Sequence, residues 1–187
     1  MTKIFKRKAV ALPLMAALIG GMIAPSAMAQ TAKGSSVEAR LATLEDQAAL
    51  KRLVDTFSNL ADTKEIDAQV LLFTPDATVT SYVDGKPSAP LKGRKALADA
   101  FGGFLAQFST VYHINGQQTV DIKGNQATGT SYCLVVLIRE EGGKIIRRTS
   151  GVRYQDRYVK QDGRWLIAER SSHFEWTAID ETPSSAS

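Results

Sequence analysis

The feature that most constrains this chain is a run of four extended segments that fills its C-terminal part. Each segment alternates apolar or β-branched residues with polar ones, and only three short turns, each containing glycine, separate the segments. Consecutive strands joined by such turns pair antiparallel, and strands longer than the usual five or six residues require bulges and strong curvature. We therefore expect a long, curved antiparallel meander, with strands over 111–122, 127–139, 144–160 and 164–176.

Helical patterns precede this sheet. Apolar residues recur at three- and four-residue spacing from Val37 to Ala61, and a capping-box pattern at 43–46 predicts a short helix followed by a longer one. A strand over 77–82 and a further helix over 93–108 follow. This order predicts an α+β domain, a cone-shaped α+β barrel whose N-terminal helices pack in the concave face of the sheet. The mouth of such a cone is a natural site for a small ligand.

Residues 1–29 have the form of a secretory signal peptide. Four basic residues, a broken apolar run and the small-residue pattern Ala27-Met28-Ala29 follow one another. A membrane anchor is the alternative, but the apolar run is short and interrupted, so we expect no stable membrane insertion after removal of the leader. The prediction is a secreted, periplasmic protein with a flexible lead-in at 30–36, one domain at 37–176 and a disordered tail at 177–187.

Loss of the leader also removes the excess of positive charge. The whole chain has a net charge of +4, and the leader contains four basic residues and no acidic one. The mature protein is therefore about neutral, which disfavours nucleic acid as a partner. Arg139, Arg147 and Arg148 lie near Glu140 and Glu141 in the sequence, a pattern that predicts a solvated strand surface.

The single cysteine, Cys133, has no partner for an internal disulfide and lies in an apolar segment. We expect it to be a small buried side chain rather than a nucleophile. The sequence contains no motif of metal-ligating residues and no glycine-rich phosphate loop. We therefore expect neither a metal ion nor an organic cofactor.

His113 is the strongest candidate for chemistry. It lies in a β-branched, apolar run, and Asp62 ends the long helical pattern upstream. A histidine oriented by a buried carboxylate makes a simple general base. The alternatives are a core histidine bonded to a backbone carbonyl and an aspartate that caps the turn at Lys64. An acidic residue at a helix C-terminus opposes the helix dipole, which favours another purpose for Asp62.

Four segments of the sequence resemble the SnoaL-like branch of the nuclear transport factor 2-like superfamily. They are Leu-Val-Asp-Thr-Phe-Ser-Asn-Leu-Ala-Asp at 53–62, Phe-Thr-Pro-Asp-Ala at 73–77, Leu-Lys-Gly-Arg-Lys-Ala-Leu at 91–97 and Asp-Gly-Arg-Trp-Leu-Ile at 162–167. Within this branch the chain is most similar to the cofactor-free lyases of the scytalone dehydratase and hexachlorocyclohexane dehydrochlorinase type. The resemblance implies that Asp62 and His113 form a catalytic pair. It also implies that Arg170, on the last strand, stabilises a developing anion.

The sequence alone does not decide the role of Arg170 or of several tyrosines. Arg170 has Glu169 and Glu175 nearby in the sequence and could form a surface ion pair with either. The candidates for hydroxyl donors in substrate binding, or alternatively for packing, are Tyr82, Tyr112, Tyr132 and Tyr154. By strand alternation His173 lies on the opposite face from Arg170, outside the cone.

Two departures from the dehydrochlorinase pattern concern the wall of the expected pocket. That type has a lysine five residues before its aspartate, where this chain has Phe57, and a tryptophan on the first strand, where this chain has Val79 or a neighbour. We therefore expect a substrate other than the halogenated ring.

Together these observations predict a cofactor-independent lyase or isomerase. It would abstract a carbon-bound proton from a small cyclic or aromatic substrate and eliminate water or another leaving group. The alternative is a non-catalytic module that binds a small hydrophobic metabolite in the same cone. A role in assembly through the outer face of the sheet is a third possibility, and we expect a homodimer or homotrimer.

Overall fold

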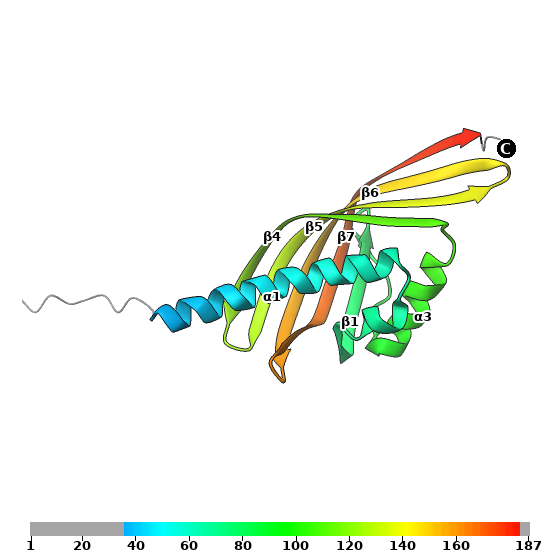
Figure 1. Cartoon of the computed structure of the whole chain (residues 1–187). Helices are drawn as coiled ribbons and strands as arrows, with labels where there is room; N and C mark the ends of the chain where they lie inside the picture. The colour runs from blue at the N-terminus through cyan, green and yellow to red at the C-terminus, as the bar shows by residue number, and fades with distance from the viewer. Residues whose placement is uncertain (1–35, 184–187) are drawn as a thin grey trace, which may run out of the picture. The chain divides into compact units, whose positions relative to one another are not determined.

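The structure is a computed structural model, and it describes residues 36–183. The predicted signal peptide at 1–29 lies outside the described residues, as do 30–35 of the lead-in and 184–187 of the tail. The elements, labelled in Figure 1 where there is room, are α1 (Val37–Asp62), α2 (Ile66–Val70), β1 (Phe73–Val83), β2 (Lys86–Pro87), β3 (Leu91–Lys92), α3 (Gly93–Leu105), β4 (Thr110–Lys123), β5 (Gln126–Glu141), β6 (Lys144–Gln161) and β7 (Arg164–Pro183).

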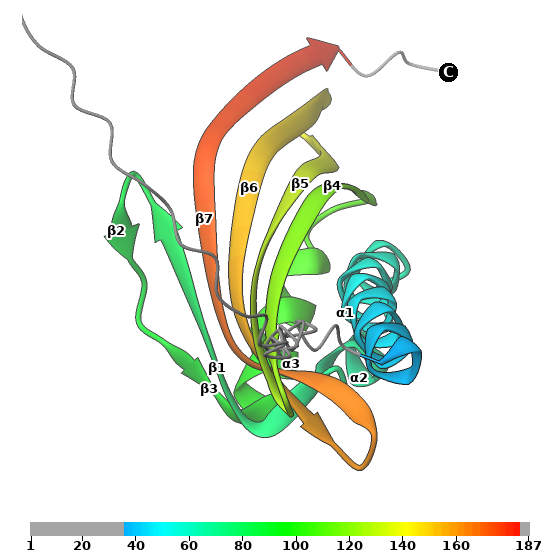
Figure 2. The same cartoon turned by 90° about the vertical axis from the view of Figure 1, so that its left-hand side faces the viewer.

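The strands form one curved sheet in the order β2-β1-β7-β6-β5-β4, with β3 paired to β1. Strands β4 to β7 form the predicted antiparallel meander. Strand β1 runs parallel to β7, so the sheet is mixed, and it stays open rather than closing into a barrel. Figure 2 shows the sheet curving around the helices, which confirms the predicted α+β arrangement with helices on the concave side.

Helix α1 is continuous, so the prediction of a short helix followed by a longer one is wrong. Its N-cap is Ser36, whose Oγ accepts a hydrogen bond from the Ala39 amide at 3.1 Å. Thr43 does not cap a second helix, because its hydroxyl donates to the Ala39 carbonyl at 2.9 Å, within the helix. Asp46 accepts hydrogen bonds from Lys160 at 2.7 Å and from the Trp165 indole at 2.8 Å. The acidic residue of the supposed capping box therefore anchors α1 to β6 and β7.

Strand β7 is longer than predicted and corrects the tail assigned to 177–187. Residues 177–183 continue the strand and pair with the start of β6, Thr177 opposite Ser150 and Pro183 opposite Lys144. Two cross-strand ion pairs support this extension, Lys144 with Glu181 at 2.8 Å and Arg147 with Asp180 at 3.1 Å. Polar composition alone suggested disorder, whereas opposite charges across the hairpin stabilise pairing.

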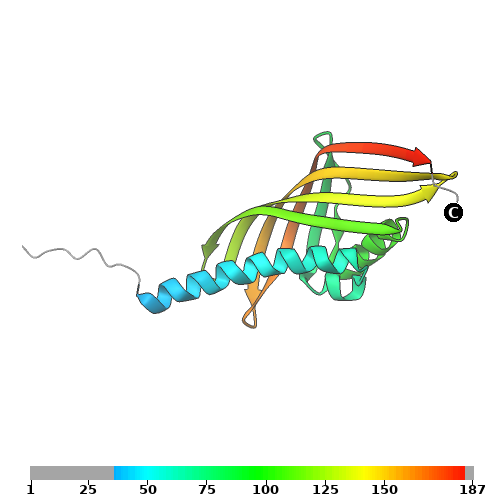
Figure 3. The same ribbon diagram turned by 45° about the horizontal axis from the view of Figure 1, so that its top comes forward.

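The core lies between the helices and the inner face of the sheet. Half of α1 contributes the buried side chains of Leu50, Leu53, Val54 and Phe57, which pack on residues of β1, β6 and β7. Fully burying one such side chain contributes about 1.5–3 kcal/mol. The first turns of α1 instead extend beyond the sheet, as Figures 1 and 3 show, and their apolar side chains are exposed.

A second cluster of buried residues lies where the C-terminal end of α1 meets α3 and the middle of the meander. Cys133 belongs to this cluster and is buried, as predicted. The two clusters flank a space between α1, α3 and the sheet that side chains do not fill. Of the helices within residues 36–183, none is long and apolar enough to cross a membrane.

Candidate active site

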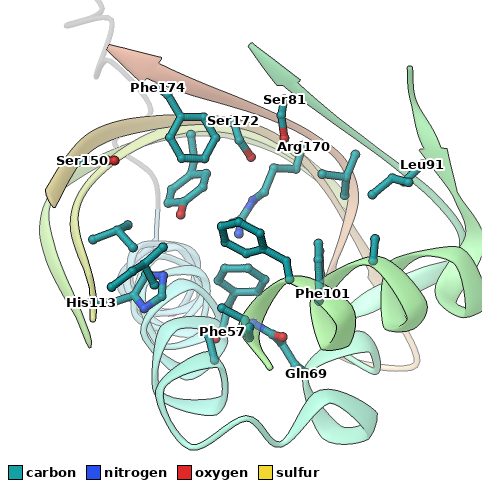
Figure 4. Close-up of a pocket in the computed structure, with 18 of the residues that line it drawn as sticks. Phe57, Gln69, Ser81, Leu91, Phe101, His113, Ser150, Arg170, Ser172 and Phe174 are labelled. Atoms are coloured by element: carbon teal, nitrogen blue, oxygen red, sulfur yellow. Dashed lines mark hydrogen bonds between the residues drawn. The ribbon is translucent and has the colours of Figure 1, made fainter. Parts of the chain in front are cut away.

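A cavity of about 380 Å³ opens between α1, α3 and the inner face of the sheet. Figure 4 shows side chains from the helices on one side of it and from β1, β6 and β7 on the other. Most of its wall is apolar, and the larger apolar members include Phe57, Phe101, Phe104, Leu105, Leu137 and Phe174. Its polar members include His113, Arg148, Arg170 and three serines. An apolar pocket with a few converging polar groups is the usual form of a site for a small organic molecule.

His113 lies on β4 and reaches the cavity from the side of α1. Its Nδ1 lies 2.6 Å from Oδ1 of Asp62, the last residue of α1, and its backbone amide donates to Oδ2 of the same carboxylate at 3.3 Å. Asp62 thus contacts both the ring and the backbone of His113, and it does not cap the turn at Lys64. The side chain of His113 is 7% exposed and that of Asp62 is 22% exposed.

The carboxylate determines which ring nitrogen of His113 carries the proton. An ionised carboxylate only accepts hydrogen bonds, so the 2.6 Å contact assigns the proton of the neutral ring to Nδ1. Nε2 is then unprotonated, and no residue within 36–183 donates to it. A lone pair on a cavity-lining histidine is the arrangement that a general base requires.

Burial is the largest influence on His113 and lowers its pKa from the ordinary value of 6.5. Asp62 opposes this effect by stabilising the imidazolium, whereas the positive charge of Arg170 adds to it. The net pKa of His113 is lowered. The ring is therefore neutral at neutral pH, ready to accept a proton.

Arg170 lies on β7 and points into the cavity from a different wall, as Figure 4 shows. It is 2% exposed, and its guanidinium forms two hydrogen bonds to Asp156 on β6, at 2.8 and 2.7 Å. The surface pairings considered for it are wrong, because Glu169 and Glu175 face outward and bind Arg157 and Arg153. Strand alternation explains the difference, since 169 and 175 lie on the opposite face from 170.

The surroundings of Arg170 fix both its charge and its position. Its guanidinium carbon lies 4.3 Å from the ring centre of Phe57 and 4.4 Å from that of Tyr154. Burial by itself would lower the pKa of Arg170, but the Asp156 carboxylate outweighs burial and raises it. One nitrogen, Nη1, is buried without a hydrogen-bond partner among the described residues. Arg170 therefore retains a free donor beside the cavity.

Of the four candidate tyrosines, only Tyr154 lines the cavity. Tyr112 and Tyr132 are 53% and 42% exposed, because each is the strand neighbour of an inward-facing residue. Tyr82 stacks on His173 with ring centres 4.4 Å apart. The cavity is lined instead by their strand neighbours Ser81 and Ser172. Tyr82 and His173 therefore lie on the outer face, and the prediction for three of these tyrosines is wrong.

Burial raises the pKa of the Tyr154 hydroxyl above its ordinary value, so it stays protonated and can donate a hydrogen bond. The pKa of the Cys133 thiol is raised to about 12, chiefly by burial, which excludes a thiolate nucleophile at neutral pH. Among residues 36–183, no group of three or more His, Cys, Asp or Glu side chains could hold a metal ion.

Sequence reasoning missed Asp156, the serines of the cavity wall and the inward direction of Arg148. The serines are Ser81, Ser150 and Ser172, all on the sheet wall in Figure 4. Strand alternation could have identified two of these residues. Arg148 and Ser150 are an even number of positions from the predicted Tyr154 on β6, so all three face the same side of the sheet.

Residues 42–171 match the model of the SnoaL-like domain family. No curated protein matches. A type 2 hexachlorocyclohexane dehydrochlorinase is 16% identical, with 79% of this chain and 97% of that chain covered and a TM-score of 0.66. A candidate scytalone dehydratase from Novosphingobium aromaticivorans is 21% identical, with 79% of this chain and 99% of that chain covered and a TM-score of 0.65. A nuclear transport factor 2-like protein with a cystatin-like fold from the same species is 25% identical, with 74% of this chain and 87% of that chain covered and a TM-score of 0.58.

Proposed function

This chain belongs to the SnoaL-like domain family, and we propose that it is a cofactor-independent lyase or isomerase that acts on a small cyclic or aromatic molecule. The observation that carries the proposal is the contact between His113 and Asp62 at the edge of an apolar cavity. The fold is shared with a dehydrochlorinase and a candidate scytalone dehydratase, which is compatible with this class of reaction.

In the proposed reaction, Nε2 of His113 takes a proton from a carbon atom of the substrate. Asp62 keeps the ring in the tautomer that has its lone pair on Nε2, and it stabilises the imidazolium that forms. The electron pair of the broken C–H bond then forms a double bond and expels the leaving group. In an isomerisation, it forms an enolate that is protonated elsewhere. The imidazolium returns the proton to the leaving group, to the substrate or to water.

Arg170 would stabilise the negative charge that develops as the proton leaves. Its free Nη1 supports this role, since that donor has no other partner among the described residues. The bond to Asp156 holds the guanidinium in place, so no reorganisation is needed during the reaction. Asp62 and Asp156 are in this view positioning residues, whereas His113 and Arg170 contact the reacting atoms.

The wall of the cavity supports a small apolar substrate. Phe57 lines it where the dehydrochlorinase type has a lysine, and Val79 lines it on the first strand, where that type has a tryptophan at this position or a neighbouring one. Phe57 packs its ring against Arg170 instead of adding a second cation there. The volume of about 380 Å³ suits a molecule of one or two rings.

We also propose that the protein is exported to the periplasm. The basic, apolar and small-residue regions at 1–29 support export. Fractionation of cells that express the full chain, with N-terminal sequencing, tests this proposal. We expect a periplasmic protein beginning at Gln30, and an unprocessed cytoplasmic product would contradict it.

The test of the reaction compares two histidine variants. Cyclic alcohols, halides and ketones are screened with the wild type for elimination or isomerisation, and the best substrate is then used. We expect His113→Gln to lower kcat by at least about 100-fold, because it removes the general base. His173→Gln makes the same change on the outer face and should retain wild-type kcat. Binding of these compounds without turnover, or turnover that survives in His113→Gln, would overturn the proposal and favour a binding module.

A test of Asp62 requires a measurement that would not change if this residue had only a structural role. NMR titration of His113 should give a higher pKa in the wild type than in Asp62→Asn, because the carboxylate favours the charged ring. Equal pKa values in the two proteins would contradict the proposed pair.

A further inference from the structure

The adjacent arginines of β6, Arg147 and Arg148, face opposite sides of the sheet. Arg147 points outward and pairs with Asp180 at 3.1 Å. Arg148 lines the cavity, and its Nε is buried without a hydrogen-bond partner among the described residues. The sequence pattern predicted a solvated surface for both residues, and for Arg148 that prediction is wrong because neighbours on a strand alternate in direction.

Arg148 differs from the other arginines of its strand in having no counter-charge. Arg147, Arg153 and Arg157 each contact a carboxylate of β7, at 3.1, 2.7 and 2.6 Å. Within residues 36–183, no aspartate or glutamate lies within ion-pair distance of Arg148. A cation that is partly buried and has an unsatisfied donor is costly unless something else supplies the acceptor.

The cavity wall contains a cation that no carboxylate pairs with. Arg148 and Arg170 line the cavity together with the neutral ring of His113, and no acidic side chain among the described residues lines it. Asp156 neutralises Arg170, and Asp62 is bonded to His113. One cation, Arg148, remains for a ligand.

We propose that the substrate carries a carboxylate and that Arg148 binds it, so that Arg148 determines specificity for small cyclic or aromatic acids. This inference rests on the proposed function and names its substrate class. A planar guanidinium matches a carboxylate in a bidentate manner. A single uncompensated charge in a largely apolar cavity suits a monoanion better than a doubly charged phosphate.

One serine hydroxyl lies near Arg148 on the cavity wall. Ser150 follows Arg148 on the same face of β6, and its hydroxyl contacts that of Thr177 at 2.9 Å. Ser81 and Ser172 line the cavity farther from Arg148, because Ser172 pairs with Tyr154, six residues along β6 from Arg148. The Ser150 hydroxyl offers a nearby carboxylate a donor that the apolar part of the wall cannot provide.

The register places the proposed carboxylate away from the reacting carbon. His113 is opposite Val135, which is opposite Ser150, so Arg148 lies two strands across and two residues along from His113. Strand spacing of about 4.8 Å and a rise of about 3.4 Å per residue separate the two Cα atoms by about 12 Å. Both side chains line the same cavity, and this separation suits one small ring between the carboxylate and the base.

Binding of matched acids and amides tests the proposal without turnover. The probes are benzoate, phenylacetate and 3-phenylpropanoate, each against its neutral amide, in isothermal titration calorimetry with the purified protein. For the pair of best length, we expect the wild type to bind the acid at least about tenfold more tightly than the amide, a difference of about 1.4 kcal/mol. Equal affinities in all three pairs, or no binding of any acid, would overturn the proposal.

Two substitutions assign the preference to Arg148. Arg148→Gln should bring the acid and the amide to within about twofold, with the affinity for the amide unchanged, whereas Arg147→Gln should keep the wild-type preference. An acid preference that persists in Arg148→Gln would implicate Arg170 and overturn the assignment. If Arg148→Gln loses the amide as well, Arg148→Lys decides: a remaining preference supports the proposal and equal affinities contradict it.

His113→Gln separates this inference from the proposed function. It should lose turnover but keep the preference for acids, because His113 is not the proposed carboxylate ligand. Turnover of neutral substrates with no acid preference would overturn the substrate class alone. An acid preference in a protein without turnover would overturn the reaction alone.

Discussion

The cavity is bordered by two carboxylate–nitrogen pairs that differ in burial and in chemistry. Asp156 and Arg170 are 0% and 1% exposed at their side chains, and two hydrogen bonds join them. Asp62 and His113 are 22% and 7% exposed, and one short contact joins their side chains. The first pair therefore supplies a fixed charge, whereas the second can exchange a proton with a molecule in the cavity.

The two carboxylates do different work because their partners differ. A guanidinium stays protonated at any ordinary pH, so Asp156 always has a cation to neutralise. An imidazole changes its charge near neutral pH, so Asp62 stabilises a charge that comes and goes. Asp156 also accepts a hydrogen bond from Tyr158 at 2.8 Å, which adds to its enclosure. Removal of one carboxylate should therefore damage stability, and removal of the other should chiefly alter titration.

The largest expected effect follows from breaking the buried ion pair of Asp156 and Arg170. Asp156→Asn leaves the charge of Arg170 buried without a counter-ion, and such changes cost about 3–5 kcal/mol. Urea denaturation monitored by circular dichroism should show this loss in the free energy of unfolding. Asp180→Asn makes the same change in an exposed pair and should cost less than about 1 kcal/mol. Equal losses in the two variants would mean that burial of the Asp156–Arg170 pair adds nothing to its contribution to stability.

The pairing of Asp156 with Arg170 could not be predicted from the sequence. Counting back from the turn at Asp162 and Gly163 pairs Gln161 with Arg164 and Tyr158 with Ile167, as the structure has it. Continued without interruption, the count sets Asp156 opposite Glu169. A bulge between Arg157 and Tyr158 shifts the register by one residue and brings Asp156 opposite Arg170. Long strands predict that bulges occur but not where, so this pair could not be found from the sequence.

The pair of Asp62 and His113 could be predicted from the sequence because each residue lies at a recognisable position in its helix or strand. Asp62 ends a helix whose apolar spacing is plain in the sequence, and His113 lies in a clear strand. Strand alternation then predicted that His173 faces away from Arg170, and it also separates Tyr112 from His113. The parallel pairing of β1 with β7 left no such signal, because it joins segments far apart in the chain.

A smaller effect is expected on the pH dependence of stability, and it tests the role of the pair of Asp62 and His113. The pKa of His113 is lowered in the folded protein, chiefly by burial, so the unfolded chain binds more protons below about pH 6.5. Stability should therefore fall as the pH decreases below that value, by at most about 1.4 kcal/mol per pH unit. His113→Gln should lose this component of the slope.

Urea unfolding between pH 5 and pH 8 measures that slope. His173→Gln retains His113 and makes the same substitution elsewhere, so it serves as the matched control and keeps the His113 component. A His113→Gln curve parallel to that of the wild type would mean that burial does not affect the titration of this ring.

The smallest expected effect is on Cys133, which responds to both pairs. Its pKa is raised to about 12, chiefly by burial, with Arg170 lowering it and Asp62 raising it by lesser amounts. Because only the thiolate reacts, labelling by a disulfide reagent at pH 8 should be slow in the wild type. Asp62→Asn removes only a minor influence and should change the labelling rate by less than about threefold, or about 0.7 kcal/mol. Asp156→Asn should accelerate labelling more, because a less stable fold opens more often. Equal acceleration in the two variants would mean that the pairs support the same part of the core.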